Sequence, residues 1–257
     1  MHSLYKQDFR VDETLNGMAE SQGMSLEQFA KSMNFETVEK MIEDYTNYKK
    51  QSIEKYKNYR DNDTNQESVN TYGGFYIARY EAGDGDANGT RRSSSSSNSN
   101  TVVSKKGAIV YNYISQPDSI TRAESMYAGK SKLISGAGWD RTLNWLIETK
   151  AKTENEVFVN SSSWGNYKDS TGNAKTNSGP SNMNYTTGRN EEWKANNIYD
   201  LAGNVWDWTT EAYSSDKRVF RGGDCVNGGS NNPASSRSDN DSGCSNYSVG
   251  FHPALYL

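Results

Sequence analysis

The sequence has few of the residues that build disulfide frameworks, metal centres or membrane spans. Its 257 residues include two cysteines, two histidines and four prolines, and 33% are hydrophobic, below the roughly 45–50% usual for globular domains. Two cysteines exclude a disulfide framework, and no apolar stretch approaches the ~18 residues of a membrane helix. The N-terminus, MHSLYKQDF, has no apolar export-signal core. We expect a soluble chain without membrane insertion, and its localisation stays open.

Charge is unevenly distributed along the chain. The net charge is −4, and residues 1–70 hold 13 acidic and 9 basic residues, while the remainder holds 19 of each. The main part of the chain is therefore neutral and carries no basic patch. For this reason we expect no nucleic-acid partner.

Aromatic residues and glycine are abundant, with 17 tyrosines, 6 tryptophans and 22 glycines. Because disordered chains lack aromatic residues, this composition indicates a folded, loop-rich domain anchored by aromatic side chains. We expect a helical N-terminal segment over residues 1–62, a polar linker over residues 63–70, and one domain over residues 71–257.

The first sixty residues carry a helical pattern. Ser25 and Gln28 have the spacing of a capping box that opens a short helix over 26–33, and Asn34 is expected to cap the next helix. Apolar and aromatic residues then recur mostly at steps of three or four. These residues are Phe35, Val38, Met41, Ile42, Tyr45, Tyr48, Ile53, Tyr56 and Tyr59. The helix either packs on its own domain or serves for tethering or homo-oligomer formation.

Strands and loops are predicted at both ends of the main domain. Residues 73–81 are predicted to form a strand, because the side chains from Phe75 onward alternate between two faces. Residues 83–100, rich in Gly, Asp, Asn and Ser, predict a mobile insertion loop that builds no core. Residues 158–188 are predicted to form a long loop, and residues 218–221 a strand.

Two helices are predicted between these segments. Thr121 and Glu124 have capping-box spacing at the start of a helix over residues 119–127. Gly136-Ala137-Gly138 is expected to break the chain before a second helix over residues 139–148. The apolar face of this second helix consists of Trp139, Leu143, Leu146 and Ile147, which we expect in the core.

Several blocks of sequence stand in a characteristic order. They are GGFYIARYE, SITRAESMY, GAGWDRTLNWL, NIYDLAGNVWDWT, RVFRGG and GFHPAL. In this order they resemble the formylglycine-generating-enzyme (sulfatase-modifying factor) domain family, over roughly residues 70–257. The resemblance implies an α+β class, namely a C-type-lectin-like fold with short strands, two helices and extensive loops.

The block NIYDLAGNVWDWT has candidate ligands for a cation. Gly203 permits a tight or left-handed turn, and Asp200 and Asp207 flank that turn. With the backbone carbonyls of Gly203 and Val205, the two carboxylates supply the oxygen ligands that calcium prefers. In the family this loop resembles a structural calcium site. The resemblance therefore implies a structural calcium ion as the candidate cofactor, and the predicted function requires no cofactor. The alternative is that both aspartates cap the turn without metal.

Enzymatic chemistry known in this family needs residues that the chain lacks. Formylglycine-generating enzymes bind copper through two cysteines close in sequence, because a soft metal needs converging thiolates. Cys225 and Cys244 are far apart in sequence, and neither matches that pair. The related sulfoxide synthases hold iron with three histidines, whereas this chain has only His2 and His252. We therefore expect no enzyme activity, with a copper-dependent oxidase as the least favoured interpretation.

The last 36 residues, 222–257, lack Lys, Glu, Gln, Met and Trp, which together make up 52 of the first 221 residues. At that frequency, a stretch of 36 residues without any of the five types arises by chance on the order of a few times in a hundred thousand. A loop composition explains the absence of Met and Trp, but not that of Lys and Glu. Adenine mutagenesis by a diversity-generating retroelement explains all five, because an AAY asparagine codon cannot become any of them.

The retroelement interpretation assigns a set of ligand-binding positions within a variable region of about residues 221–257. Gly228-Gly229-Ser230, Pro233-Ala234-Ser235, Arg237 and Pro253-Ala254-Leu255 resemble the fixed framework of retroelement target proteins, which carry their variable residues on one exposed face of this fold. The variable positions are Asp224, Cys225, Val226, Asn227, Asn231, Asn232, Ser236, Ser238, Asp239, Asn240, Asp241, Gly243, Cys244, Asn246, Tyr247 and His252.

Two of these positions leave alternatives open. His252 stands where the family usually has an arginine that supports the fold, so it is either diversified or weakens local packing. Cys225 and Cys244 are read as products of diversification, with a disulfide between them as the alternative.

The sequence thus predicts a non-enzymatic binding protein of phage or bacterial origin. Its localisation stays open, with a phage virion and a bacterial surface as the alternatives. Its partner would be a variable protein or other surface ligand on a host or target cell. Asp, Asn and Ser would form hydrogen bonds, and Tyr247 would supply rigid aromatic area, as in antibody loops. The alternative is an undiversified structural or adhesion module of the same fold.

Overall fold

The computed structural model describes residues 11–47, 66–88, 92–94, 99–175 and 183–256. The helices are α1 (Val11–Ser21), α2 (Leu26–Ser32), α4 (Gln66–Tyr72), α5 (Gln116–Glu124), α6 (Gly136–Glu148) and α7 (Glu154–Phe158), with a further helical stretch at residues 38–47. Among these, no helix is long and apolar enough to cross a membrane.

The strands are short and come from distant parts of the chain. They are β1 (Tyr76–Ile77), β2 (Gly83–Asp84), β3 (Val102–Val103), β4 (Ile109–Val110), β5 (Ser131–Leu133), β6 (Lys194–Ala195), β7 (Ile198–Tyr199), β8 (Trp206–Ala212), β9 (Lys217–Arg221), β10 (Arg237–Asp241), β11 (Val249–Phe251) and β12 (Pro253–Leu255). The α+β class with short strands and long loops is confirmed.

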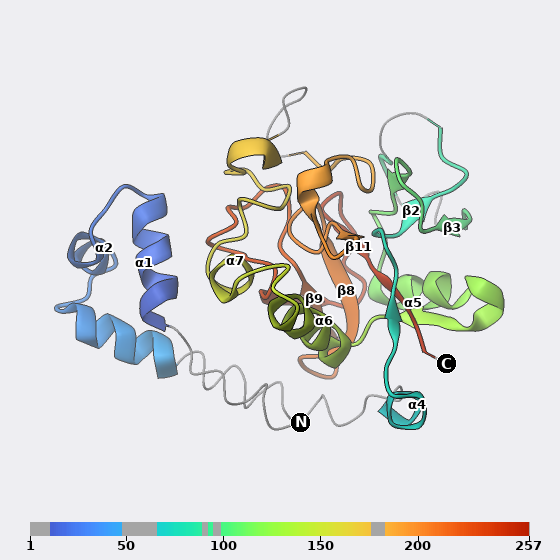
Figure 1. Ribbon diagram of the computed structural model, residues 1–257, viewed down its shortest axis with the longest axis horizontal. Helices are drawn as coiled ribbons and strands as arrows, with labels where there is room; N and C mark the ends of the chain where they lie inside the picture. Colours follow the sequence, from blue (N-terminus) through green and yellow to red (C-terminus); the bar gives the residue numbers. More distant parts are fainter. Residues whose placement is uncertain (1–10, 48–65, 89–91, 95–98, 176–182, 257) are drawn as a thin grey trace.

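Strand pairing joins the two ends of the main domain. The C-terminal strand β12 lies between β1 and β5 in an antiparallel sheet. A four-stranded sheet has the order β10-β9-β8-β11, in which β11 runs parallel to β8. Strand β2 lies between β3 and β4, and β6 pairs with β7. Figure 1 shows β8 and β9 near the middle of the domain, with α5 and α6 around them.

The N-terminal helices form a small bundle with its own apolar interior, seen at one side of the main domain in Figure 1. The buried residues of this interior are Leu15, Ala19, Phe29, Ala30 and Met41, and Phe35, Val38, Ile42 and Tyr45 pack partly buried against them. Helix α1 contacts the main domain, because a Cβ atom on Gly17 would lie 2.8 Å from Val159 Cγ1. The expected apolar positions Tyr48, Ile53, Tyr56 and Tyr59 lie outside the described residues.

The capping box of α2 is confirmed. Ser25 Oγ accepts a hydrogen bond from the Gln28 N–H at 3.3 Å, and Gln28 Oε1 accepts one from the Ser25 N–H at 2.8 Å. Asn34 does not cap the next helix. It adopts a left-handed backbone, with φ of 65°, just beyond the end of α2, and Thr37 Oγ1 instead accepts from the Lys40 N–H at 3.1 Å.

Part of the expected linker over residues 63–70 is helical, because α4 begins at Gln66. Val69 of α4 packs against the main hydrophobic core, which gives this polar stretch an anchor. The helix ends at Gly73, whose N–H donates to the Val69 carbonyl at 2.9 Å and whose φ is 78°. Residues 63–65 lie outside the described part.

The strand expected over residues 73–81 is shorter than predicted. Regular pairing is confined to Tyr76 and Ile77 opposite Leu255 and Ala254. Farther along, the Ala78 N–H donates to the Pro253 carbonyl at 2.9 Å. Because the partner chain turns from β12 into β11 at this point, the ladder breaks up into single hydrogen bonds.

The expected insertion loop over residues 83–100 contributes to the interior, so the prediction that it builds no core was wrong. Asp84 and Arg92 are both buried and form an ion pair at 3.2 Å. The Arg92 guanidinium lies over the Tyr111 ring, 4.0 Å from its centroid. A paired charge stacked on an aromatic ring thus replaces the missing aliphatic residues. Residues 89–91 and 95–98 lie outside the described part.

The first predicted helix is present as α5 but begins three residues earlier. Ser115 Oγ accepts from the Asp118 N–H at 3.2 Å, and Pro117 occupies the first turn, where its missing N–H costs nothing. Thr121, the expected cap, lies inside the helix and donates from its hydroxyl to the Pro117 carbonyl at 3.1 Å.

The second predicted helix is α6, and it too begins early. Ser135 Oγ accepts from the Gly138 N–H at 3.0 Å, so the glycines expected to break the chain form the first turn of the helix. Its predicted apolar face is confirmed, since Trp139, Leu143 and Leu146 are buried and Ile147 packs against the same cluster. Helix α7 was not predicted and follows a capping box of Thr153 and Glu156.

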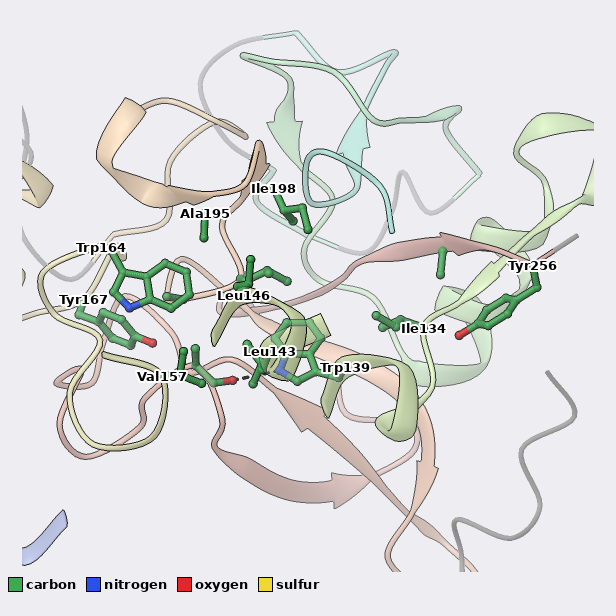
Figure 2. Packing of buried hydrophobic residues seen from close by; sticks show 14 residues of the cluster. Ile134, Trp139, Leu143, Leu146, Val157, Trp164, Tyr167, Ala195, Ile198 and Tyr256 are labelled. Atoms are coloured by element: carbon green, nitrogen blue, oxygen red, sulfur yellow. Dashed lines mark hydrogen bonds between the residues drawn. The ribbon is translucent and has the colours of Figure 1, made fainter. Parts of the chain in front are cut away.

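The core of the main domain is aromatic, as the composition indicated. In Figure 2, Trp139 lies between Trp164 and Tyr167 on one side and Ile134 and Tyr256 on the other. The Trp139 Nε1–H donates to the Ala234 carbonyl at 3.0 Å. This bond ties α6 to the tail, so the tail is held on the same core that the family blocks build.

A buried ion-pair group holds the start of β10 against α6. Arg221 donates to Asp140 Oδ1 at 2.5 Å and is fully buried. Arg237 pairs with Asp140 as well, and its Nε donates to Glu211 Oε1 at 3.1 Å. Because each carboxylate faces an arginine, the group joins α6, β8, β9 and β10 without leaving a lone buried charge.

Candidate ligand-binding surface

All the predicted variable positions except His252 fall into three stretches of the tail: the turn at residues 224–232, strand β10 with the residue before it, and the turn at residues 243–247. His252 lies between β11 and β12. The exposed positions are Asn231, Asn240, Asp241, Gly243 and Tyr247. The half-buried positions are Val226, Asn227, Asn232, Ser236, Ser238, Asp239, Cys244 and Asn246. These thirteen positions are accessible, as a binding surface requires.

Three predicted positions do not lie on an exposed face. Asp224 is 3% exposed, and Cys225 and His252 are fully buried. The Cys225 N–H donates to the Asn204 carbonyl at 3.2 Å, which draws this part of the tail inward. A side chain at any of these positions affects a ligand only through the fold.

Asp224 organises the first turn. Its Oδ1 atom accepts from the N–H groups of Val226 and Asn227, both at 3.1 Å, and from Asn227 Nδ2 at 2.8 Å. Behind this turn, the Gly229 N–H donates to Asp169 Oδ1 at 2.8 Å. The turn is therefore fixed from inside, and Val226 and Asn227 are presented at its surface.

Strand β10 is the edge of the four-stranded sheet, with β9 as its one partner among the described strands. Ser238 and Asn240 point to one face of the strand, and Asp239 and Asp241 to the other, as strand geometry requires. Asp239 forms an ion pair with Lys217 of β9 at 3.1 Å. This edge adds small polar side chains to the surface.

The third turn is held by side chains from outside the tail. Asn112 Nδ2 donates to the Tyr247 carbonyl at 2.6 Å, and Asn184 Nδ2 donates to the same oxygen at 2.7 Å. Asn246 Oδ1 accepts from the Ser248 N–H at 2.9 Å. Both clamping asparagines are buried, so the backbone of Tyr247 is fixed while its side chain is 42% exposed.

The Tyr247 ring lies beside the first turn. Partial burial raises the pKa of its hydroxyl, and the negative charges of Cys225, Asp224 and Tyr113, when ionised, raise that pKa further. Tyr247 therefore remains a neutral phenol at physiological pH, able both to donate and to accept a hydrogen bond.

Neither Cys225 nor Cys244 forms a disulfide in the structure. Cys225 is buried. Cys244 is half-buried and packs against a hydrophobic cluster that includes Tyr111, Trp208 and Phe251. Asn246 Nδ2 lies 3.8 Å from Cys244 Sγ, and partial burial raises the pKa of the Cys244 thiol.

The two candidate calcium ligands Asp200 and Asp207 share one buried region with Glu81 and His252. His252 Nδ1 lies 3.5 Å from Asp207 Oδ2, and Asp200 Oδ2 accepts from the Gly188 N–H at 2.7 Å. Burial raises the pKa of Asp200 to about 7, and it raises the pKa values of Asp207 and Glu81 as well.

The calcium assignment stays a prediction. Gly203 has the expected left-handed backbone, with φ of 73°, and a Cβ atom there would collide with the Asn166 carbonyl. The Gly203 N–H donates to the Gly222 carbonyl at 2.9 Å, and the backbone of Val205 hydrogen-bonds Glu81. Among the described residues, no group of three or more His, Cys, Asp or Glu side chains is placed to hold a metal ion.

Sequence reasoning missed the residues outside the tail that shape this surface. Asn112 and Asn184 lie in loops with no motif of their own, and their role depends on contacts across more than sixty residues of chain. Glu81 is the last residue of the block GGFYIARYE, and its Oε2 accepts a hydrogen bond from Asn204 Nδ2 at 2.6 Å. Its place at the end of that block was the one sequence signal available for it.

The arrangement of short strands, long loops and a C-terminal strand paired near the start of the domain is the C-type-lectin-like fold of the formylglycine-generating-enzyme type. The sequence model of the sulfatase-modifying factor enzyme 1-like domain matches residues 101–255. The chain belongs to this family.

Two solved structures are similar at a distance. The Treponema denticola variable protein 1 is 19% identical, with a TM-score of 0.33, and the match covers 49% of this chain and 48% of that chain. The chain thus spans about half of that protein. CarF is 13% identical, with a TM-score of 0.45, and the match covers 77% of this chain and 83% of that chain. No curated protein sequence matches the chain.

Proposed function

We propose that this chain is a non-enzymatic ligand-binding protein whose tail is diversified by the adenine mutagenesis of a retroelement. The partner is a protein or another surface ligand on a host or target cell. The observation that carries the proposal is the absence of Lys, Glu, Gln, Met and Trp from residues 222–257.

The exposure of several tail positions supports this explanation of the absence over one based on packing. Lysine and glutamate suit exposed positions, and Asn231, Asn240 and Asp241 are exposed. Asn240 and Asp241 also lie on an edge strand, where charged residues, lysine above all, protect against aggregation. Nothing in the packing at these positions excludes the two residue types. A limit on which codons can arise accounts for their absence, and a limit imposed by the fold does not.

The surface chemistry supports a binding role. The accessible tail positions carry small polar side chains around one exposed tyrosine, a combination that antibody loops use for adaptable hydrogen bonds and rigid contact area. Their backbones are fixed from behind by Asp224, Asn112 and Asn184. A surface with a fixed backbone can change its side chains without changing the fold.

The test is to read the genomic locus and to sequence sister clones. We expect a reverse transcriptase gene and a near-identical template repeat, with differences between clones confined to the tail positions. The exposed asparagines Asn16 and Asn173, outside the tail, are the matched controls and should remain constant. A locus without the reverse transcriptase and the repeat would overturn the proposal. Differences scattered over Asn16, Asn173 and the tail alike would favour the undiversified adhesion module.

The copper-oxidase alternative has its own test. Two converging thiolates would bind Cu(I) tightly, with one ion per reduced chain. We expect no stoichiometric Cu(I) binding by the reduced chain, and no difference between it and a Cys244→Ser variant. Tight binding that is lost in Cys244→Ser would favour the oxidase.

A further inference from the structure

Tyr113 stands outside the tail, yet its backbone contacts the tail turn directly. Its N–H donates to the Asn246 carbonyl at 2.9 Å. The neighbouring Asn112 side chain holds the carbonyl of Tyr247. Two consecutive residues of this loop therefore bind two consecutive residues of the tail.

The backbone of Tyr113 is unusual for its side chain. Its φ is 55°, in the left-handed region that bulky residues rarely occupy and that glycine occupies freely. Backbone strain of this kind gathers at binding sites, where the surrounding structure imposes it. The contacts of Asn112 and of the Tyr113 N–H with the tail would be available to a chain with glycine at position 113. The backbone contacts therefore do not explain why position 113 carries a tyrosine side chain.

The position of the ring supplies that reason. Tyr113 is half-buried, and its N–H bond to the Asn246 carbonyl at 2.9 Å places it against the residue that precedes Tyr247. Tyr113 and the exposed Tyr247 therefore both lie at the third turn. Tyrosine side chains supply large rigid contact area at low entropic cost, which suits a protein surface.

We propose that Tyr113 is a constant binding residue of the variable surface, and that the occupant of this surface is a folded protein. The inference rests on the proposed function. Tyr113 would supply affinity shared by every diversified copy, and the tail would select the partner. Position 113 lies upstream of the biased tail, so mutagenesis of the tail leaves the ring in place.

The role of Tyr113 can be tested with a library of displayed full-length chains that differ in their tails. Val226, Asn227, Asn246 and Tyr247 are varied to the residues that an AAY codon can reach, and binders are selected on immobilised lysozyme. Tyr113→Asn is then introduced into each recovered binder. Asparagine tolerates a left-handed backbone, so the substitution removes the ring and keeps the fold.

We expect Tyr113→Asn to weaken most binders at least about tenfold, the loss typical of a buried interface tyrosine. The matched control is Tyr127→Asn. Tyr127 is also a left-handed tyrosine, with φ of 47° and 61% exposure, but it lies beyond the C-terminal end of α5. We expect this control to leave binding unchanged. If Tyr113→Asn does not fold, Tyr113→Gly removes the same ring without a left-handed penalty.

The outcomes separate the inference from the function beneath it. Binders whose affinity stays within twofold in Tyr113→Asn would overturn the role of Tyr113 and leave the proposed function standing. A library that yields no binder to lysozyme would count against the proposed function itself. Enrichment on a mannan surface, but not on lysozyme, would overturn the assignment of a protein partner.

Discussion

The Asn112 side-chain amide donates a 2.6 Å hydrogen bond to the backbone carbonyl of Tyr247. Asn112 is 1% exposed, whereas the Tyr247 side chain is 42% exposed. The bond therefore joins the protein interior to the backbone of the most prominent side chain of the surface. It holds the backbone of Tyr247 in place and leaves the side chain of Tyr247 free to vary.

Replacing Asn112 by alanine should destabilise the chain. The Tyr247 carbonyl would keep only the Asn184 donor, and we expect a loss of about 1–3 kcal/mol in the free energy of unfolding, measured by urea denaturation. Asn240→Ala, on the exposed edge of β10, should change this free energy by less than about 0.5 kcal/mol. Equal losses in the two variants would show that the hydrogen bond from Asn112 to the Tyr247 carbonyl does not stabilise the fold.

The two thiols should differ in reactivity. Cys225 is buried and Cys244 is half-buried, with its thiol pKa raised by partial burial. Under native conditions we expect a thiol-reactive dye to label one cysteine per chain slowly, and to label two after unfolding. Cys244→Ser should abolish native labelling, and Cys225→Ser should not. No labelling in the unfolded chain without a reductant would reveal a disulfide.

The ordered sequence blocks were enough to predict the class of fold, because they hold aromatic residues and turns that any member of the fold must place alike. The apolar face of α6 and the strand β9 follow directly from local periodicity. The start of α5 was misplaced because Ser115 and Thr121 are both acceptable caps by residue type. The proline at position 117 marked the correct first turn.

Other features depend on contacts between distant residues. The burial of Asp84 depends on Arg92 and on the Tyr111 ring, which no local pattern connects. In the tail, composition identified the accessible positions but could not separate Asp224 from Asn227. Asp224 turns inward because its carboxylate satisfies the N–H groups of the turn that it begins.

His252 should behave as a residue of the fold and not of the binding surface. It is fully buried, its Nε2 lies 2.9 Å from the Ala78 carbonyl, and its Nδ1 faces Asp207. His252→Ala would leave the Asp207 carboxylate buried without this partner, and we expect a loss of about 3 kcal/mol or more in unfolding free energy. Asn231→Ala, at an exposed tail position, is the control and should cost little. A His252→Ala variant as stable as the parent would restore His252 to the set of freely variable positions.

Gly136 should not tolerate even a methyl group. An ideal Cβ atom there would collide with Glu211 Oε2 and lie 2.7 Å from its Cδ. Glu211 cannot move aside easily, because it is held by Arg237 at 3.1 Å. We expect Gly136→Ala to cost about 1–3 kcal/mol, seen as a lower Tm. Gly74→Ala, where a Cβ atom meets nothing within 4 Å, should leave the Tm unchanged or slightly higher, and a similar drop in both variants would contradict the packing argument.

Stability should fall as the pH rises from about 4 towards neutrality. Burial raises the pKa of Asp200 to about 7, above the roughly 3.9 of an unfolded aspartate. The folded chain therefore holds a proton that the unfolded chain has released, and this stabilisation is present at low pH and lost through pH 7. Glu81 and Asp207 have pKa values raised in the same direction. One such proton gives a slope of at most about 1.4 kcal/mol per pH unit.

Urea denaturation at several pH values between 5 and 8 measures that slope, and Asp200→Asn should reduce it. An amide oxygen at position 200 can still accept from the Gly188 N–H, as Asp200 Oδ2 does at 2.7 Å. Asp216→Asn is the control, because the pKa of exposed Asp216 is lowered, mainly by its hydrogen bond from Ser214. Repeating the series with calcium and with a chelator tests the calcium prediction. A bound cation would keep both aspartates ionised and flatten the slope, so a flat profile with calcium and a steep one with chelator would support that site. A profile that is flat under both conditions would contradict the raised pKa of Asp200.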